Sequence, residues 1–202
     1  NSPRSVEIAI DKYRSLSLMA DAGIKVPEFV VCQSRRQGMA AFNKLGGDVV
    51  LKPIFGSMGK NLHRLSDART ALECMATFVE KGEVVYLQKF VNHGGSDLRI
   101  LIVGDKVFSM KRVNPTGGWL TNISRGSIAE PHVATPEEIE VARMAARAND
   151  CQIAGVDIVY EEGSTVPMVL EVNASPGWEA IQKVCGDDVA AEVLKFVTSF
   201  NV

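Results

Sequence analysis

Long apolar runs are missing from this 202-residue chain. No run approaches the roughly 20 residues that a membrane-spanning helix needs. The first residues, NSPRSVEIAIDKYR, also lack the apolar core of a signal peptide. We therefore expect a cytoplasmic protein that has no membrane partner.

Cysteine and histidine are scarce and do not cluster. The four cysteines, Cys32, Cys74, Cys151 and Cys185, form no CxxC pair, and the three histidines are equally scattered. Closely spaced Cys and His residues are the usual ligands of structural zinc, so this spacing does not favour a zinc site. Free thiols in a reducing compartment fit the pattern better.

An excess of charge of either sign is also absent. The net charge is −2 and the sequence pI is about 6.0. A nucleic-acid-binding domain usually has a strongly basic balance, so we expect no nucleic-acid partner, and any site that binds an anion must be local. The length is sufficient for one large domain or for two small lobes, each with a core.

What the sequence does contain is a pair of apolar, β-branched runs near its C-terminus. Residues 154–160 and 166–172 are such runs, and the polar stretch between them predicts a β-hairpin. If the loop is centred on Ser164, Asp157 lies directly opposite Glu171, and paired residues point to the same side of a sheet.

Asn173 follows Glu171 by two positions and is predicted to share a face with Asp157. Two neighbouring carboxylates repel each other unless a cation neutralises them, and ligands that are all oxygen favour a hard ion such as Mg²⁺. The pattern therefore indicates a metal site, with a solvent-facing polar side of an edge hairpin as the alternative. The opposite, apolar face is predicted to consist of Val156, Ile158, Tyr160, Leu170 and Val172.

A glycine-containing loop lies between two predicted strands in residues 49–65, VVLKPIFGSMGKNLHRL. The first strand carries Lys52, and the N–H groups of Gly56, Ser57 and Gly59 could surround a phosphate. The loop is not a Walker A motif, because only two residues separate its glycines. A plain hairpin turn is the more frequent explanation of such a short pattern taken alone.

Five segments are predicted to be helical from their apolar periodicity and their capping residues. Thr135 and Glu138 form a capping box at the start of one of them. In another, we expect Leu72, Met75 and Phe78 to form a stripe that packs against the core. The predicted helices cover residues 6–22, 35–45, 68–81, 136–149 and 188–200.

The remaining predicted secondary structure consists of β-strands. Residues 24–32 and 83–91 are predicted strands, and residues 96–113 a hairpin that turns at Gly104 and Asp105. Residues 114–127, NPTGGWLTNISRGS, are glycine-rich and irregular, which is typical of a segment that covers a site. The charges that we assign to a solvated face of the hairpin are Asp97, Arg99, Lys111 and Arg112.

Seven motifs in a fixed order give the chain a resemblance to the ATP-grasp ligases of the RimK type, and the match covers nearly all of the sequence. Each motif is weak alone, but the order makes the resemblance specific. The motifs are DK (Asp11 and Lys12), VVLKPIFGSMGKN (49–61), LQKFV (87–91), SDLRILIVGDKV (96–107), TNISRG (121–126), AGVDIV (154–159) and EVNASPG (171–177).

The resemblance implies an α+β, ATP-grasp fold in which two α+β lobes with antiparallel sheets clamp ATP. Residues 23–91 would form the N-lobe with its glycine-rich flap, residues 92–202 the C-lobe with the metal site, and residues 1–22 a helical segment that joins the C-lobe. It also implies a reaction in which a substrate carboxylate attacks the γ-phosphate and an amine then displaces phosphate from the acylphosphate, forming an amide. L-glutamate or another amino acid would be the amine, and a protein C-terminus or the glutamyl tail of a small coenzyme the acceptor.

The resemblance also assigns roles to residues by their positions. Lys12 and Lys52 match phosphate-binding lysines, and Asp97 matches the residue that holds ribose. Two Mg²⁺ or Mn²⁺ ions would bind Asp157, Glu171 and Asn173. The flap corresponds to Gly56, Ser57, Gly59 and Lys60, and the hinge that reads the adenine edge to Gln88, Lys89, Phe90 and Val91. The residues that face the phosphates and the acceptor are Arg99, Arg112, Asn122 and Arg125.

Three departures from the family pattern keep other interpretations open. Leu120 stands where relatives often have arginine, Lys89 stands where an acid is common, and relatives carry a further N-terminal domain. An ATP- and Mg²⁺-binding module without ligase activity is therefore one alternative, and a ligase for a different amino acid is another. An interaction domain whose carboxylates form only a polar sheet face is the third. The interpretation also allows for a homo-oligomer.

Overall fold

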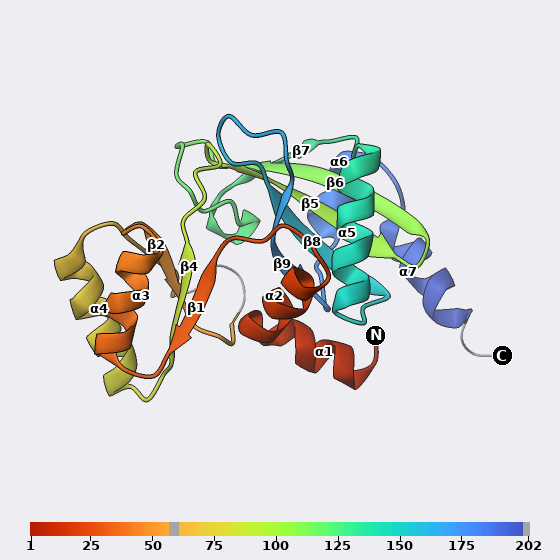
Figure 1. Cartoon of the computed structure of the whole chain (residues 1–202). Helices are drawn as coiled ribbons and strands as arrows, with labels where there is room; N and C mark the ends of the chain where they lie inside the picture. The colour runs from red at the N-terminus through yellow and green to blue at the C-terminus, as the bar shows by residue number, and fades with distance from the viewer. Residues whose placement is uncertain (57–60, 200–202) are drawn as a thin grey trace. The chain divides into compact units, whose positions relative to one another are not determined.

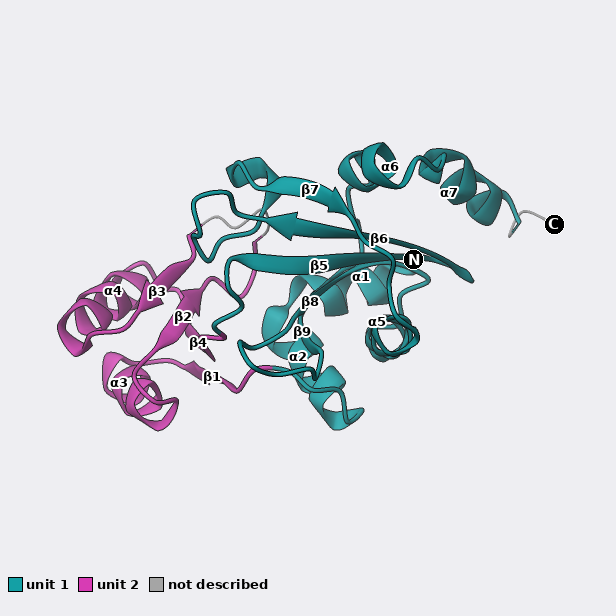
Figure 2. Cartoon of the chain, turned by 90° about the horizontal axis from the view of Figure 1, so that it is seen from above, with its two compact units in different colours: residues 1–26, 92–202 teal, residues 27–91 magenta. Residues whose placement is uncertain are grey.

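The computed structural model describes residues 1–56 and 61–199. Three residues of the predicted flap, Ser57, Gly59 and Lys60, lie outside this range. The chain divides into two compact units, one formed by residues 27–91 and the other by residues 1–26 together with residues 92–202 (Figure 2). Within the described residues, no helix is long and apolar enough to cross a membrane.

The unit of residues 27–91 is an antiparallel four-stranded sheet with two helices. The strand order is β1-β4-β2-β3. The strands are β1 (Phe29–Cys32), β2 (Val49–Lys52), β3 (His63–Leu65) and β4 (Val85–Lys89). The helices are α3 (Arg35–Lys44) and α4 (Ala68–Glu80), which start at the side-chain caps Ser34 and Asp67.

One face of this sheet is an apolar core, and the other carries both polar and apolar side chains, among them the buried Val50 and Tyr86. Val49, Leu51 and Leu87 are buried in one cluster with residues of α3 and α4. Because side chains alternate along a strand, Lys52 and Gln88 lie on the opposite face. The predicted stripe on α4 is confirmed for Met75 and Phe78 but wrong for Leu72, which is 45% exposed.

The other unit is built on a five-stranded antiparallel sheet with the order β7-β6-β5-β8-β9. Its strands are β5 (Ser96–Val103), β6 (Lys106–Val113), β7 (Ile128–Pro131), β8 (Ile153–Val159) and β9 (Met168–Asn173). Its helices are α1 (Pro3–Ile10), α2 (Lys12–Asp21), the short 3₁₀ turn η1 (Ile123–Arg125), α5 (Pro136–Ala148), α6 (Glu179–Cys185) and α7 (Val189–Thr198).

Helices cover both faces of this sheet. Helix α5 packs on β5 and β8 and α2 on β9, while α6 and α7 contact β6, β7 and β5. Figure 2 shows α6 and α7 on the opposite side of the sheet from α5 and α2. The buried cluster under α6 and α7 contains Leu101, Val103, Phe108 and Met110. The part of this sheet face that the two helices cover is therefore apolar.

The N-terminal helix is interrupted, which corrects the prediction of one helix over residues 6–22. Asp11 has an extended backbone conformation, and its side chain caps α2 by accepting a hydrogen bond from the Arg14 N–H. Aspartate favours this capping role over a position inside a helix, because its carboxylate competes for nearby N–H groups. The break makes Lys12 the first residue of α2. Figure 1 shows α1 and α2 as two separate helices.

The predicted hairpin register is confirmed, with Asp157 paired to Glu171 and Gly155 to Asn173. A register shift between Asp157 and Ile158 then places Val169 opposite Ile158. Leu170 is the extra residue at this bulge and is half-buried. Its assignment to the apolar face was therefore wrong.

Candidate functional site

A row of charged side chains crosses four strands on one face of the five-stranded sheet. Arg112 on β6 is paired with Asp97 on β5, Arg99 on β5 with Asp157 on β8, and Asp157 with Glu171 on β9. The same face is apolar further along the strands, under α6 and α7. Three carboxylates and two guanidiniums are thus placed at the end of a hydrophobic layer, where water is partly excluded.

Asp157 is the carboxylate at the centre of the row, and two arginines neutralise it. Arg99 contacts it through both Nε and Nη2, with Nη2 at 3.0 Å from Oδ2, and Arg112 Nη2 also lies 3.0 Å from Oδ2. Burial alone would raise the pKa of Asp157, but Arg112 and Arg99 outweigh it and hold this pKa below its usual value. From the sequence we expected a cation to neutralise the neighbouring carboxylates of Asp157 and Glu171. At Asp157 the chain itself supplies this positive charge, through Arg99 and Arg112.

Asp97 and Arg112 form a buried ion pair, so the predicted solvated face is wrong for both. Arg112 Nε lies 2.7 Å and Nη2 2.5 Å from the two oxygens of Asp97, and the two side chains are 3% and 5% exposed. Thr121 donates a third hydrogen bond to Asp97 at 2.7 Å. Burial raises the pKa of Asp97, and Arg112 opposes that rise. Both oxygens of Asp97 already accept hydrogen bonds from Arg112 or Thr121, so Asp97 could bind ribose only by accepting further bonds on the same oxygens.

Glu171 and Asn173 hold the more accessible oxygens of the row. The Glu171 side chain is 31% exposed, and one of its oxygens lies 3.6 Å from Nζ of the buried Lys12. Asn173 donates from Nδ2 to the Gly155 carbonyl at 3.3 Å, which turns its amide oxygen away as an open acceptor. In the part of the chain that the structure describes, no three His, Cys, Asp or Glu side chains are arranged to hold a metal ion. A metal site here would thus rest on one or two carboxylates, with the amide oxygen of Asn173, water or substrate phosphates as further ligands.

The segment of residues 114–127 is tied to this row through Thr121. Asn114 and Ser127 donate to the Leu120 carbonyl at 2.7 and 3.3 Å, and the next residue, Thr121, donates to Asp97. Asn122, half-buried, precedes η1, and Arg125 lies exposed within it. Our sequence interpretation missed Thr121 as an anchor, because only the fold brings its hydroxyl to Asp97.

The predicted nucleotide residues of the other unit lie on the sheet face opposite its apolar core and at the end of β4. Lys52 donates to the side-chain oxygen of Gln88, and Gln88 is 2% exposed with its Nε2 unpaired within the described residues. The Lys89 side chain pairs with Glu28 at 3.3 Å. The N–H groups of Lys89 and Phe90 bond to the carbonyls of Glu28 and Asp48, which leaves the N–H of Val91 without a backbone partner in residues 1–56 and 61–199.

Arg64 on β3 is a further side chain near this hinge that the sequence did not single out. Its guanidinium lies 3.5 Å from the centre of the Phe90 ring and pairs with Asp48 at 2.9 and 2.7 Å. Stacking of this kind orients an aromatic ring. The pairing of Val50 with both Arg64 and Gln88 places the two side chains in one row of the sheet.

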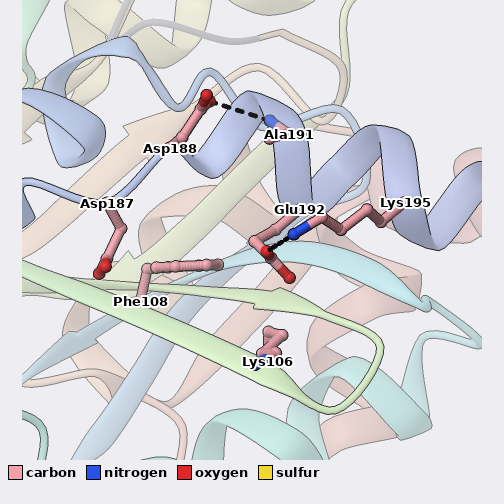
Figure 3. A pocket seen from close by; sticks show the side chains of 7 residues that line it. All are labelled: Lys106, Phe108, Asp187, Asp188, Ala191, Glu192 and Lys195. Carbon is pink, nitrogen blue, oxygen red and sulfur yellow. Dashed lines mark hydrogen bonds and ion pairs between the residues drawn. The ribbon is translucent and has the colours of Figure 1, made fainter.

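A small pocket lies apart from the charged row, between β6 and α7 (Figure 3). Its volume is about 200 Å³. Two of its charged groups have local structural roles, because Asp188 caps α7 and Glu192 pairs with Lys195 at 2.6 Å. None of the predicted site residues lines it. The lining residues are Lys106, Phe108, Asp187, Asp188, Ala191, Glu192 and Lys195.

The fold places the chain in the ATP-grasp class. The solved structure of the ATP-grasp ligase PsnB, complexed with a phosphomimetic variant of its minimal precursor, Mg and ADP, matches with a TM-score of 0.77 at 20% identity. The match covers 100% of this chain and 62% of that one. The family model of the RimK-like ATP-grasp domain matches residues 9–197, and the chain belongs to this family.

Curated relatives extend the comparison beyond the fold. The chain is 32% identical over 224 residues to the tetrahydromethanopterin:alpha-L-glutamate ligase of Methanosarcina acetivorans, covering 98% of this chain and 69% of the relative. It is 35% identical over 199 residues to a probable alpha-L-glutamate ligase of Mannheimia succiniciproducens, covering 98% and 66%. The chain therefore spans about two thirds of the length of these relatives.

Proposed function

We propose that the chain is the ATP-grasp part of an ATP-dependent carboxylate-amine ligase that uses L-glutamate as the amine. The observation that carries this proposal is the charged row on β6, β5, β8 and β9, in a chain of the RimK-like family whose relatives are named glutamate ligases. An ATP-dependent reaction and four free cysteines fit the cytoplasm.

The reaction proceeds in two steps. An oxygen of the acceptor carboxylate attacks the γ-phosphorus of ATP, which gives an acylphosphate and ADP. The amine nitrogen of glutamate then attacks the acyl carbon, loses a proton and expels phosphate, leaving an amide. Phosphoryl transfer needs positioning and charge neutralisation more than covalent help. We assign this task to Arg99 of the row and to Lys12 on α2, which pairs with Glu171 of the row, and we place Asn122 and Arg125 on the acceptor side.

The family implies Mg²⁺, and the oxygen donors of this site fit a hard cation. Glu171 offers a partly exposed carboxylate, and the amide oxygen of Asn173 is open because its Nδ2 group is bonded to the chain. Asp157 would share its oxygens with Arg99 and Arg112. We assign these three residues to two Mg²⁺ or Mn²⁺ ions, which supply neutralising charge to the ATP phosphates when bound.

The nucleotide itself is assigned to residues 52–91. Lys52 would contact the phosphates. The N–H of Val91, which has no backbone partner within the described residues, and Nε2 of Gln88, which has no partner there, would donate to a base. Gly56, together with the flap residues 57–60, keeps its predicted role as a cover of the phosphates.

ADP release tests the activity. The protein is incubated with MgATP and L-glutamate and with either a peptide that has a free C-terminal carboxylate or a folate that carries a glutamyl tail. We expect ADP release that requires both amine and acceptor, and a product heavier by one glutamyl residue in mass spectrometry. Lys12→Gln is expected to lower ADP release, and Lys183→Gln, at an exposed lysine that pairs with Glu179, is its matched control. ADP release that is independent of amine and acceptor would contradict ligation, and release with a different amino acid would reassign the amine.

A further inference from the structure

Arg112 links carboxylates on two different strands while it is almost completely buried. Its Nε and Nη2 donate to Asp97, and the same Nη2 lies 3.0 Å from Asp157. Only 5% of the side chain is exposed. A planar guanidinium fixes the orientation of the carboxylates it bridges, whereas a lysine ammonium would act as a point charge.

Asp97 passes this arrangement on to the segment of residues 114–127. Its Oδ2 accepts both from Arg112 and from Thr121 Oγ1, the latter at 2.7 Å. Thr121 is 7% exposed, and the preceding carbonyl, that of Leu120, is held by Asn114. A continuous path therefore runs from the segment to Asp157, through the hydrogen bonds of Thr121 and Arg112 to Asp97 and the ion pair of Arg112 with Asp157.

We propose that Arg112 is a positioning residue that couples the placement of residues 114–127 to the placement of Asp157. It acts through the two carboxylates and not by contact with a phosphate, a task left to the more exposed Arg99. Charge-assisted hydrogen bonds in a buried, low-dielectric place are directional and strong enough to transmit such a constraint. The coupling itself does not depend on the proposed function. Only the expected effect on the binding of a metal ion with nucleotide rests on it.

Hydrogen exchange of the amides in residues 114–127, measured on the whole chain without nucleotide, tests the coupling. Asp157→Asn changes the far end of the path and is expected to speed this exchange roughly three- to ten-fold, the equivalent of weakening one hydrogen bond. Glu171→Gln is the matched control, because it removes a carboxylate of the same row that pairs with Lys12 and not with Arg112. In the control we expect unchanged exchange.

Double variants distinguish coupling through one path from independent local loosening of residues 114–127. Two substitutions on one path have effects on exchange that do not add, whereas independent effects do. In an Arg112→Met background, Asp157→Asn is expected to add no further exchange. Because Arg112→Met can fail to fold, Thr121→Val provides a second background with the same expectation, and Thr121→Ser, which keeps the hydroxyl, should restore wild-type exchange. Unchanged exchange in Asp157→Asn, or additive effects in the Thr121→Val background, overturn the proposal.

The effect on metal binding is tested by measuring how tightly the protein binds Mn²⁺ with ADP. Binding is detected as the loss of the electron paramagnetic resonance signal of free Mn²⁺. Thr121→Val is expected to weaken Mn²⁺·ADP binding roughly three- to ten-fold, and Thr121→Ser to match the wild type. Wild-type affinity in Thr121→Val, together with faster exchange, overturns the proposal. If the wild-type protein does not bind Mn²⁺·ADP, the proposed function fails, while the exchange experiment still decides the coupling.

Discussion

Asp157 lies directly opposite Glu171 on neighbouring strands, yet the two carboxylates have different environments. Asp157 is 9% exposed and contacts two guanidiniums, whereas Glu171 is 31% exposed and has one lysine at 3.6 Å. The buried carboxylate is fixed by the chain, and the exposed one keeps an oxygen available. We therefore expect Glu171 to matter more for ligand binding than for folding.

Lys12→Met should separate catalysis from stability. Its partner Glu171 is about one third exposed and can be solvated when the lysine is removed, so we expect the free energy of unfolding to change by no more than about 1 kcal/mol. Loss of a preorganised cation at the transferred phosphate should lower kcat/KM for ATP about 100-fold. Urea unfolding and steady-state kinetics measure the two effects. Unchanged kcat/KM would show that Lys12 has only a structural role.

Asp97→Asn should destabilise the fold. The substitution leaves Arg112 buried with half of its charge compensation removed, which costs about 3 kcal/mol in free energy of unfolding. The matched control is Asp48→Asn, because the Asp48–Arg64 pair is about 40% exposed and should cost less than about 1 kcal/mol. Equal losses in the two variants, measured by urea unfolding, would contradict the buried ion pair.

Gly155→Ala should displace Arg99. A Cβ at Gly155 would lie 2.9 Å from Arg99 Nη1 and 2.8 Å from Pro176 Cβ, closer than side chains pack. We expect a loss of about 1–3 kcal/mol in stability and a lower kcat, since the proline cannot rotate away. Gly177→Ala, beside the same proline, meets no described atom within 4 Å other than those of its chain neighbours, and it should behave like the wild type in both measurements. A functional, fully stable Gly155→Ala would show that the site tolerates a shifted Arg99.

The cluster around Glu138 should make stability depend on pH in the acid range. Burial alone would raise the pKa of Glu138, but hydrogen bonds with His132, the Thr135 N–H and Tyr160 outweigh it and hold this pKa below its usual value. A carboxyl whose pKa is lower in the folded state stabilises the fold above its unfolded pKa of about 4.3, and this contribution is lost as pH falls through the folded pKa.

Glu138→Gln should therefore cost about 1–2 kcal/mol at pH 7. Glutamine can still accept the capping bond from the Thr135 N–H, but the charge and one of the two acceptor oxygens are lost. The difference from the wild type should shrink when unfolding is measured below about pH 4. A difference that stays constant from pH 7 to pH 3 would mean that the carboxylate is not held in its ionised form.

Local patterns were sufficient to predict several parts of the fold. The symmetric spacing of the last hairpin gave the pairing of Asp157 with Glu171, because the period of two in a strand fixes which residues share a face. The capping box at Thr135 is also confirmed, because its two hydrogen bonds depend only on residues three apart.

Features that depend on distant partners were not predictable in this way. The burial of Asp97 and Arg112 follows from the order β6-β5-β8, which the sequence does not state. Helix α6 was missed because it starts at Trp178 without a side-chain cap, and the bulge at Leu170 because an extra residue leaves no mark in an apolar run.

Calorimetric titration with ATP, in the presence and absence of Mg²⁺, tests the central claim that the charged row holds the metal ion through which ATP binds. It should be made on the wild type and on Glu171→Gln, with circular dichroism to show that both are folded. We expect wild-type binding to need Mg²⁺, and Glu171→Gln to lose at least about ten-fold in affinity, about 1.4 kcal/mol, in the presence of Mg²⁺ only. Equal MgATP affinity in the two proteins, or no binding by the folded wild type, would contradict the account.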